Sequence, residues 1–310
     1  MLKSSKKSLC PVCESKNTEY RSKYRYKSLH FQNLSRHLCL DCGLQFAFPM
    51  PERKILDNYN RSYHNKAHGG LNRNKIENAF FTGIAKTRIK FIKENIKFNF
   101  SRKMKVLEVG PGPGAFLEKW IDNFPNTEYF VLESDKSCIP ILKNLGAIIL
   151  NEDQLIDASY KFDFLVISHV LEHVSDPKIF LSKFIKTMKK GAFAFIEVPC
   201  NDWEHKKIDE PHLLFFDKKP MIALLKKLRV CKINISYYGT PIKKLKSKMS
   251  TFLNRIRTFL NRKKINFYHP ERSKLKDILA DDLEVNAIIN FDAHKKQEIP
   301  SWWLRTIFKK

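Results

Sequence analysis

The chain has 310 residues, of which 57 are Lys or Arg and 32 are Asp or Glu, and its formal net charge is +25. Because 43% of the residues are hydrophobic, the chain is too apolar to be disordered despite this charge, and its length predicts one main domain with appendages. The sequence has no apolar run of about 18 residues and no apolar segment after its basic start. We therefore expect a cytoplasmic protein that neither spans a membrane nor is secreted.

The positive charge is concentrated towards the two ends of the chain. Residues 1–100 carry a net charge of +13 and residues 241–310 a net charge of +10, whereas residues 101–200 carry −1. Basic flanks of this kind attract phosphate groups or an anionic membrane surface. A general preference for lysine over arginine explains the same excess without any partner, so the charge alone leaves both interpretations open.

Two CxxC pairs open the sequence, Cys10 with Cys13 and Cys39 with Cys42, with 25 residues between them. Without a secretory signal we expect reduced thiols, and two such pairs provide the four ligands of a tetrahedral zinc ion. The sequence therefore predicts a structural zinc ribbon over residues 1–50, with a β-hairpin between the pairs. Four cysteine ligands leave no open position for zinc catalysis.

Residues 51–100 have a helical pattern and are expected to form a linker or lid, in which Tyr59 and Tyr63 either cover a substrate or pack. From residue 104 onwards, short apolar runs alternate with helical stretches. The runs span residues 104–109, 128–133, 147–150, 162–168 and 192–198. Their lengths are typical of buried parallel strands, so residues 101–240 are predicted to form an α/β, doubly wound, Rossmann-like sheet.

A glycine-rich loop follows the first of these strands and contains Gly110, Gly112 and Gly114. Glycines let the backbone approach a ligand closely, and the helix that follows offers its N-terminal N–H groups. A nicotinamide dinucleotide site fits the same glycines. Glu108 favours a cationic ligand instead, because its carboxylate lies beside the loop. Glu133, at the end of the second strand, is suited to accept the hydroxyls of a ribose in either case.

In the order of these elements the sequence resembles class I S-adenosylmethionine (SAM)-dependent methyltransferases. The resemblance rests on EVGPGPG at residues 108–114, on Glu133 and on FDFLVISHVLEHVSDP at residues 162–177, and it covers residues 105–240. It implies SAM as the cofactor. The implied SAM-binding residues are Glu108, Gly110, Gly112, Gly114 and Glu133, with Asn151 and Glu152 near the adenine.

The cysteine pairs and the continuation GLQFAFPMP resemble the N-terminal module of bacterial sugar methyltransferases, including nucleotide-sugar C-methyltransferases. That resemblance implies O- or C-methylation of a small-molecule or lipid-linked sugar, such as a nucleotide-sugar or a surface-glycan precursor. It places the acceptor base at Glu210 or His212, although Pro211 interrupts the family's pattern, and His169 at the exit of the fourth strand is a third candidate. Glu172 and His173 are more simply explained as structural.

Two other functions compete with this hypothesis. One is an RNA or other nucleic-acid methyltransferase that uses the basic flanks, and the other is a non-catalytic binding protein that keeps the fold. The exit of the fourth strand reads Ser168-His169-Val170-Leu171 and lacks the Asn/Asp-Pro-Pro-aromatic pattern of adenine amino-methyltransferases. Nucleic acid is therefore the weaker expectation for a partner.

Residues 241–310 are predicted to form a basic, helical extension. Within residues 241–264, apolar residues recur every three or four positions among lysines and arginines, as in an amphipathic helix. Such a helix packs on the core or binds an anionic membrane surface, which would place the enzyme peripherally at the inner membrane face. Trp302 and Trp303 allow the same two interpretations, anchoring or packing.

Overall fold

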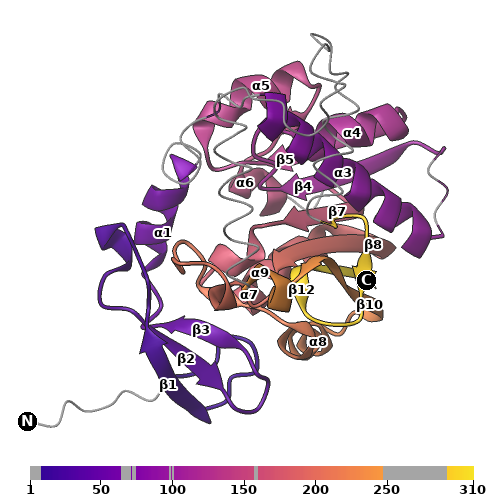
Figure 1. Ribbon diagram of the computed structural model, residues 1–310. Helices are drawn as coiled ribbons and strands as arrows, with labels where there is room; N and C mark the ends of the chain where they lie inside the picture. The colour runs from indigo at the N-terminus through magenta and orange to yellow at the C-terminus, as the bar shows by residue number, and fades with distance from the viewer. Residues whose placement is uncertain are drawn as a thin grey trace, which may run out of the picture.

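The structure of the protein, a computed structural model, describes residues 8–63, 71, 75–97, 99, 101–156, 160–246 and 292–310. It contains a large sheet of order β11-β10-β12-β8-β7-β4-β5-β6 and a small sheet of order β1-β2-β3-β9. Figure 1 shows the small sheet at one end of the molecule, away from α3 (Lys75–Asn95) and α4 (Ala115–Asn123). The α/β Rossmann-like fold predicted from the alternating runs is confirmed.

Each of the five predicted apolar runs contains a strand of the large sheet, and these five strands are parallel. They are β4 (Met104–Val109), β5 (Thr127–Leu132), β6 (Ile148–Ile149), β7 (Phe162–Ser168) and β8 (Met188–Pro199). Two further strands continue the sheet in antiparallel orientation, β12 (Ser301–Lys309) and β10 (Cys231–Pro241), and β11 (Lys296–Gln297) forms the edge.

The large sheet has a hydrophobic core on each face, because alternate residues of a strand point to opposite sides. Val106 and Phe164 belong to the core that includes α3 and α4. Leu107 and Leu165 belong to the other core, which includes α7 (Pro177–Thr187) and α8 (Lys218–Lys227) and continues into the small sheet. The remaining helices are α1 (Arg53–Asn60), α5 (Ile139–Asn144), α6 (Glu152–Ile156) and α9 (Ile242–Leu245).

The C-terminal residues of the chain form an interior strand of the large sheet. Strand β12 lies between β8 and β10, and Leu304 and Phe308 are fully buried there. The sheet therefore extends beyond the predicted domain boundary at residue 240, and Trp303 packs in the core. Of the predicted amphipathic helix over residues 241–264, residues 247–264 lie outside the described part of the chain.

The N-terminal region forms the small antiparallel sheet. Strand β1 (Thr18–Lys23) pairs with β2 (Ser35–Cys39), which pairs with β3 (Gln45–Phe48). The expected β-hairpin between the two cysteine pairs is therefore present. The fourth strand, β9 (Leu214–Phe215), comes from the distant part of the chain that follows β8, and it pairs with β3. The small sheet is thus assembled from two segments that lie far apart in the sequence.

The chain reverses direction across the large sheet at β4. From β4 the chain moves to β5 on one side, and it returns to β7 on the other side. In doubly wound sheets, ligands bind in the crevice outside the carboxyl ends of the strands at such a switch point. The loops after β4, β5 and β7 are therefore where a site is expected. Within the described residues no helix is long and apolar enough to cross a membrane.

The interior position of β12 gives a first testable prediction. Replacing the fully buried Leu304 with alanine leaves a cavity in the middle of the large sheet, and we expect the free energy of unfolding to fall by about 2–5 kcal/mol. Urea unfolding followed by circular dichroism measures this change. Lys296→Ala, at the exposed edge strand, is the matched control and should change stability little. Equal effects of the two variants would contradict the placement of β12.

Candidate functional site

A cavity of about 510 Å³ lies at the switch point. Its walls come from the loop after β4, the ends of β5 and β7, the segment before β9, the start of β12 and helix α3. Residues from Asn60 to Trp303 thus meet at one place. The lining includes Tyr63, Phe80, Phe81, Arg88, Glu108, Gly110, Gly112, Glu133, His169, Val170, Glu172, His173, Lys206, Glu210, His212, Trp302 and Trp303.

The glycine loop needs glycine for its conformation and for space. Gly110, Gly112 and Gly114 all have positive φ, with values of 69°, 56° and 83°. A Cβ on Gly110 would come within 2.5 Å of the Val170 side chain, and one on Gly114 within 2.7 Å of Leu145. The backbone N–H of Gly112 donates to Glu133 Oε2 at 2.8 Å, so the loop is tied to the end of β5. The result is a rigid turn whose backbone faces the cavity.

Two acids flank this loop, the buried Glu108 and the partly buried Glu133. Glu108 accepts a hydrogen bond of 2.8 Å from the Tyr129 hydroxyl, and burial raises the pKa of Glu108 to about 7. Burial also raises the pKa of Glu133, whose second oxygen accepts the backbone N–H of Asp135 at 2.8 Å. Each carboxylate oxygen has two lone pairs, so Glu133 retains capacity to accept further hydrogen bonds.

These features fit SAM. Glu133 has acceptor capacity for ribose hydroxyls, Gly110 and Gly112 line the cavity, and Glu108 in its ionised form adds negative potential that favours a cation. The two residues predicted near the adenine lie elsewhere in the described structure. Asn151 Oδ1 accepts the Gln154 N–H at the start of α6, and Glu152 pairs with Arg53 and Lys183, so neither lines the cavity. Their contact with adenine stays a prediction.

The exit of β7 brings His169 to the cavity, where it has a positive φ of 56°. Its Nε2 lies 3.1 Å from Glu197 Oε1 and its Nδ1 3.3 Å from Glu172 Oε1. Burial alone would lower the pKa of His169, but the two glutamates raise it. Glu197 also pairs with Arg88 and with the fully buried Arg305, at 2.6 Å each. His169 is therefore fixed between two acids and is poorly suited to accept a proton.

Glu172 and His173 follow in the short 3-10 helix η3 (Leu171–His173) and are both buried against the cavity. Burial would raise the pKa of Glu172, but the surrounding imidazoles of His169, His173 and His212 lower it to about 2. Burial lowers the pKa of His173 to about 3. The site therefore holds a carboxylate beside a neutral imidazole.

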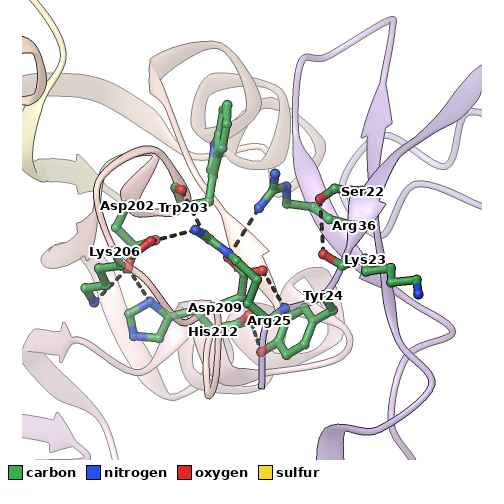
Figure 2. A network of polar contacts seen from close by, with 10 residues as sticks. All are labelled: Ser22, Lys23, Tyr24, Arg25, Arg36, Asp202, Trp203, Lys206, Asp209 and His212. Carbon is green, nitrogen blue, oxygen red and sulfur yellow. Dashed lines mark hydrogen bonds and ion pairs between the residues drawn. The ribbon is translucent and has the colours of Figure 1, made fainter. Parts of the chain in front are cut away.

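His212 has the geometry of a general base. Its Nδ1 lies 2.7 Å from Asp202 Oδ2, and Lys206 Nζ lies 2.7 Å from the same oxygen (Figure 2). Burial would raise the pKa of Asp202, but His212 and Lys206 keep it well below its usual value. Because a carboxylate only accepts hydrogen bonds, the neutral imidazole of His212 carries its proton on Nδ1 and its lone pair on Nε2. The backbone N–H of His212 donates to the Asp209 carbonyl at 2.9 Å, which fixes the segment.

Glu210, the second predicted catalytic residue of this segment, is held by the small sheet's neighbouring loop. Its Oε2 accepts the backbone N–H groups of Lys27 and Ser28 at 2.7 and 2.8 Å. Glu210 still lines the cavity, so its catalytic role stays a prediction. The hydrogen bonds add a second role, because they connect the cavity wall to the N-terminal region.

The connection between the N-terminal region and the cavity centres on Asp209, which is buried. Arg25 donates to Asp209 through its backbone N–H at 2.8 Å and through its guanidinium, and Arg36 Nη1 lies 3.2 Å from Oδ1 (Figure 2). The Arg36 guanidinium also lies 4.5 Å from the centre of the Trp203 ring. The Tyr24 hydroxyl donates to the His212 carbonyl at 2.9 Å. The small sheet therefore holds the segment that carries His212.

The four cysteines of the N-terminal region lie close together. Their Sγ atoms lie within 4.8 Å of one another, with Cys10 and Cys42 at 3.6 Å and Cys13 and Cys39 at 3.3 Å. A tetrahedral zinc site with Zn–S bonds of about 2.3 Å separates its sulfurs by roughly 3.8 Å, whereas a disulfide needs about 2.05 Å. The arrangement fits a zinc ion with four thiolate ligands, which would hold the two loops of the module together.

Several residues of the site were not found from the sequence. Asp202 lies ten positions before His212 with no motif to mark it, although an acid near a candidate base is a usable signal. Arg88 lies in a helix whose sequence indicates only packing. Trp302 and Trp303 stack at 5.2 Å between ring centres and line the cavity. Strand β12 brings them to the end of β7, which lies more than a hundred residues earlier in the chain.

A glycine loop at the switch point, an acid at the end of β5 and a neighbouring buried base define a site for group transfer from a nucleoside-containing cofactor. Similar solved structures include a SAM-dependent methyltransferase of Thermotoga maritima, 13% identical, with a TM-score of 0.46, covering 74% of this chain and 91% of that chain. Another is phosphoethanolamine N-methyltransferase 2 of Haemonchus contortus in complex with S-adenosyl-L-methionine, 11% identical, with a TM-score of 0.48, covering 93% and 71%. No curated protein matches this chain.

A family model described as a methyltransferase domain matches residues 84–281, well over half of the chain. The chain therefore belongs to this family of methyltransferase domains, and the prediction of a methyltransferase is confirmed.

The raised pKa of Glu108 predicts a pH dependence of cofactor binding. Below about pH 7 Glu108 is largely protonated in the cofactor-free protein, and a cationic ligand favours its ionised form, so binding releases a proton there. We expect the affinity for SAM to rise by up to about fivefold between pH 6 and 7 and by up to about tenfold between pH 6 and 8, and to level off above pH 8. Isothermal titration calorimetry at these pH values measures the effect.

The matched control is Glu108→Gln, which keeps the shape and the Tyr129 contact but cannot ionise. Its affinity for SAM should be lower at pH 8, and its pH dependence should be flat over the same interval. If the affinity for SAM changes equally with pH in the wild-type protein and in this variant, ionisation of Glu108 does not contribute to cofactor binding.

Proposed function

We propose that the protein transfers a methyl group from SAM to a hydroxyl or an acidic carbon of a sugar, in a nucleotide-sugar or a surface-glycan precursor. The observation that carries this proposal is the Asp202–His212 pair in the wall of the cavity, because a positioned base assists methylation of a hydroxyl or an acidic carbon. When bound, SAM supplies an electrophilic methyl group and leaves as S-adenosylhomocysteine. The residues described above would hold it at the glycine loop and Glu133.

The walls of the cavity support a sugar as acceptor. Tyr63, Phe80, Phe81, Trp302 and Trp303 supply flat apolar surfaces, and Trp302 and Trp303 are parallel within 9°. Aromatic rings of this kind pack against the apolar faces of a sugar ring, while Lys206, Glu210 and His212 offer polar groups to its hydroxyls. A mixed lining of this sort positions the acceptor, and positioning provides most of the acceleration in a displacement reaction.

His212 would take the proton that the acceptor loses. With its Nδ1–H directed at Asp202, the lone pair of Nε2 is available, and no described residue makes a hydrogen bond to that nitrogen. After proton transfer the imidazolium would lie between the carboxylates of Asp202 and Glu172, which stabilise its charge. Methyl transfer and proton transfer then leave a methylated acceptor, S-adenosylhomocysteine and protonated His212.

The N-terminal region would serve as a zinc ribbon that supports this site. Its four cysteines have the separations of a four-thiolate zinc site, and its sheet holds the segment with Asp209 and His212 through Arg25 and Arg36. We propose a structural role for the zinc ion, since four thiolates leave no position for a substrate.

The proposed function predicts where a labelled methyl group goes. Purified protein with methyl-labelled SAM should label a product in a pool of nucleotide-sugars or lipid-linked glycan precursors. Asp202→Asn should slow this transfer by about 10²-fold or more, because it removes the carboxylate that sets the tautomer of His212. Quantitative mass spectrometry of the product, or counting of the label, measures both.

His205→Ala is the control for that variant, because His205 lies on the same segment but does not line the cavity. It should keep the transfer rate within about twofold of wild type. Total RNA is included as a third pool, since the alternative function is RNA methylation by means of the basic flanks. Label found in RNA and in neither sugar pool would overturn the proposal for the acceptor.

The zinc site predicts a change in metal content. Replacing Cys39 or Cys42 with serine should remove one equivalent of zinc per chain, because three thiolates bind the ion far more weakly than four. Inductively coupled plasma mass spectrometry of the purified chains measures this. The exposed Cys231 is the matched control, and Cys231→Ser should keep the wild-type zinc content. An unchanged zinc content in the Cys39 and Cys42 variants would contradict the prediction of a zinc ribbon.

A further inference from the structure

A second group of metal-binding side chains lies at the cavity, apart from the cysteines. Glu172, His173 and His212 each offer a ligand atom, and these atoms lie within 4.8 Å of one another. All three side chains are nine-tenths or more buried. One carboxylate and two imidazoles form a donor set that binds divalent first-row transition metals, including zinc.

The polar atoms of this group lack ordinary partners. Within the described part of the chain, neither oxygen of Glu172 and neither ring nitrogen of His173 has a well-formed hydrogen bond. His169 Nδ1 is the nearest cationic group to Glu172, 3.3 Å from Oε1, but Glu197 already accepts from the other nitrogen of that ring. Buried polar atoms without partners are rare and costly, and an ion bound between these three residues would satisfy several of them at once.

The surrounding structure holds the three donors in place. The Leu213 N–H donates to the Glu172 carbonyl at 2.8 Å, which joins η3 to the segment that carries His212. The rings of His173 and His212 meet edge to face at 4.9 Å. Asp202 fixes Nδ1 of His212, and metal-bound histidines characteristically donate their other N–H to a carboxylate in this way. The donors are thus oriented before any ion binds.

We propose that Glu172, His173 and His212 bind one divalent transition-metal ion in the wall of the acceptor cavity. Three protein ligands leave open positions on such an ion, and these positions face the space where an acceptor with neighbouring hydroxyls fits. With the ion bound, Nε2 of His212 is a metal ligand, and the ion takes over the task of making the acceptor hydroxyl more acidic. Only the identity of the acceptor rests on the proposed function; the metal binding does not.

The test is the metal content of the full-length protein at equilibrium. Purified chain is dialysed to equilibrium against cobalt(II) at a low micromolar concentration, and all bound first-row metals are counted per chain. Wild type should hold two equivalents, one of them at the cysteines. Glu172→Gln and His212→Ala should each hold one, and Asp202→Asn should weaken the second site by about 10- to 100-fold. Circular dichroism shows whether each variant is folded.

His205→Ala is the matched control, because His205 is a half-buried residue whose ring nitrogens have no hydrogen-bond partner in the described residues, and it does not line the cavity. It should keep two equivalents. The visible spectrum distinguishes the sites, since cobalt bound to thiolates has intense charge-transfer absorption and cobalt bound to nitrogen and oxygen does not. A wild-type protein without the second equivalent, or one whose second equivalent survives in Glu172→Gln and His212→Ala, would overturn the proposal. Neither outcome depends on whether a sugar is methylated.

Discussion

The ion pair that Asp209 makes with Arg25 and Arg36 is the constraint on which the site depends. A buried carboxylate is tolerated only when cations and N–H groups compensate its charge, and removing one partner of a buried pair commonly costs about 3–5 kcal/mol. Here the carboxylate belongs to the segment that carries Asp202 and His212, whereas Arg36 lies in β2 of the small sheet and Arg25 in the loop after β1. The position of the base is therefore set by residues that lie about 180 positions earlier in the chain.

This constraint joins the two halves of the fold into one functional unit. Strand β9 completes the small sheet two residues after His212, and the hydrophobic core of one face of the large sheet continues among the cysteines. A metal ion at the cysteines would hold loops that in turn hold Arg25 and Arg36. Such an ion would affect the reaction only by helping to position the segment that carries His212, without contact with substrate or cofactor.

The sequence predicts those parts of the fold that depend on local patterns. The strands of the parallel sheet and the glycine loop follow from short apolar runs and from glycine itself. Helix α7 is also marked locally, because the Asp176 side chain accepts the Ile179 N–H at 2.8 Å at its start. The partner of His212 lies only ten positions away, but no motif marks it. The placement of Trp302 depends on the pairing of distant strands, about which hydrophobic periodicity gives no information.

The charge of the site is opposite to the charge of the chain. Among the described residues, four glutamates line the cavity, whereas the Arg88 and Lys206 side chains that also line it are each paired with another acid, Glu197 and Asp202. A cationic cofactor is therefore attracted locally by a protein whose net charge of +25 would repel it at long range. The excess of lysine and arginine lies in the flanks of the sequence, outside the segment with the glycine loop.

The interior place of β12 also has a consequence during synthesis. Strand β8 leaves the ribosome roughly a hundred residues before the strand that must pair with it, and until then its edge has no neighbour on that side. The nascent chain carries an open sheet edge and an incomplete cavity wall for that interval. A product that stops before residue 301 would keep every motif that identifies the enzyme in the sequence and would still lack the strand that closes its active site.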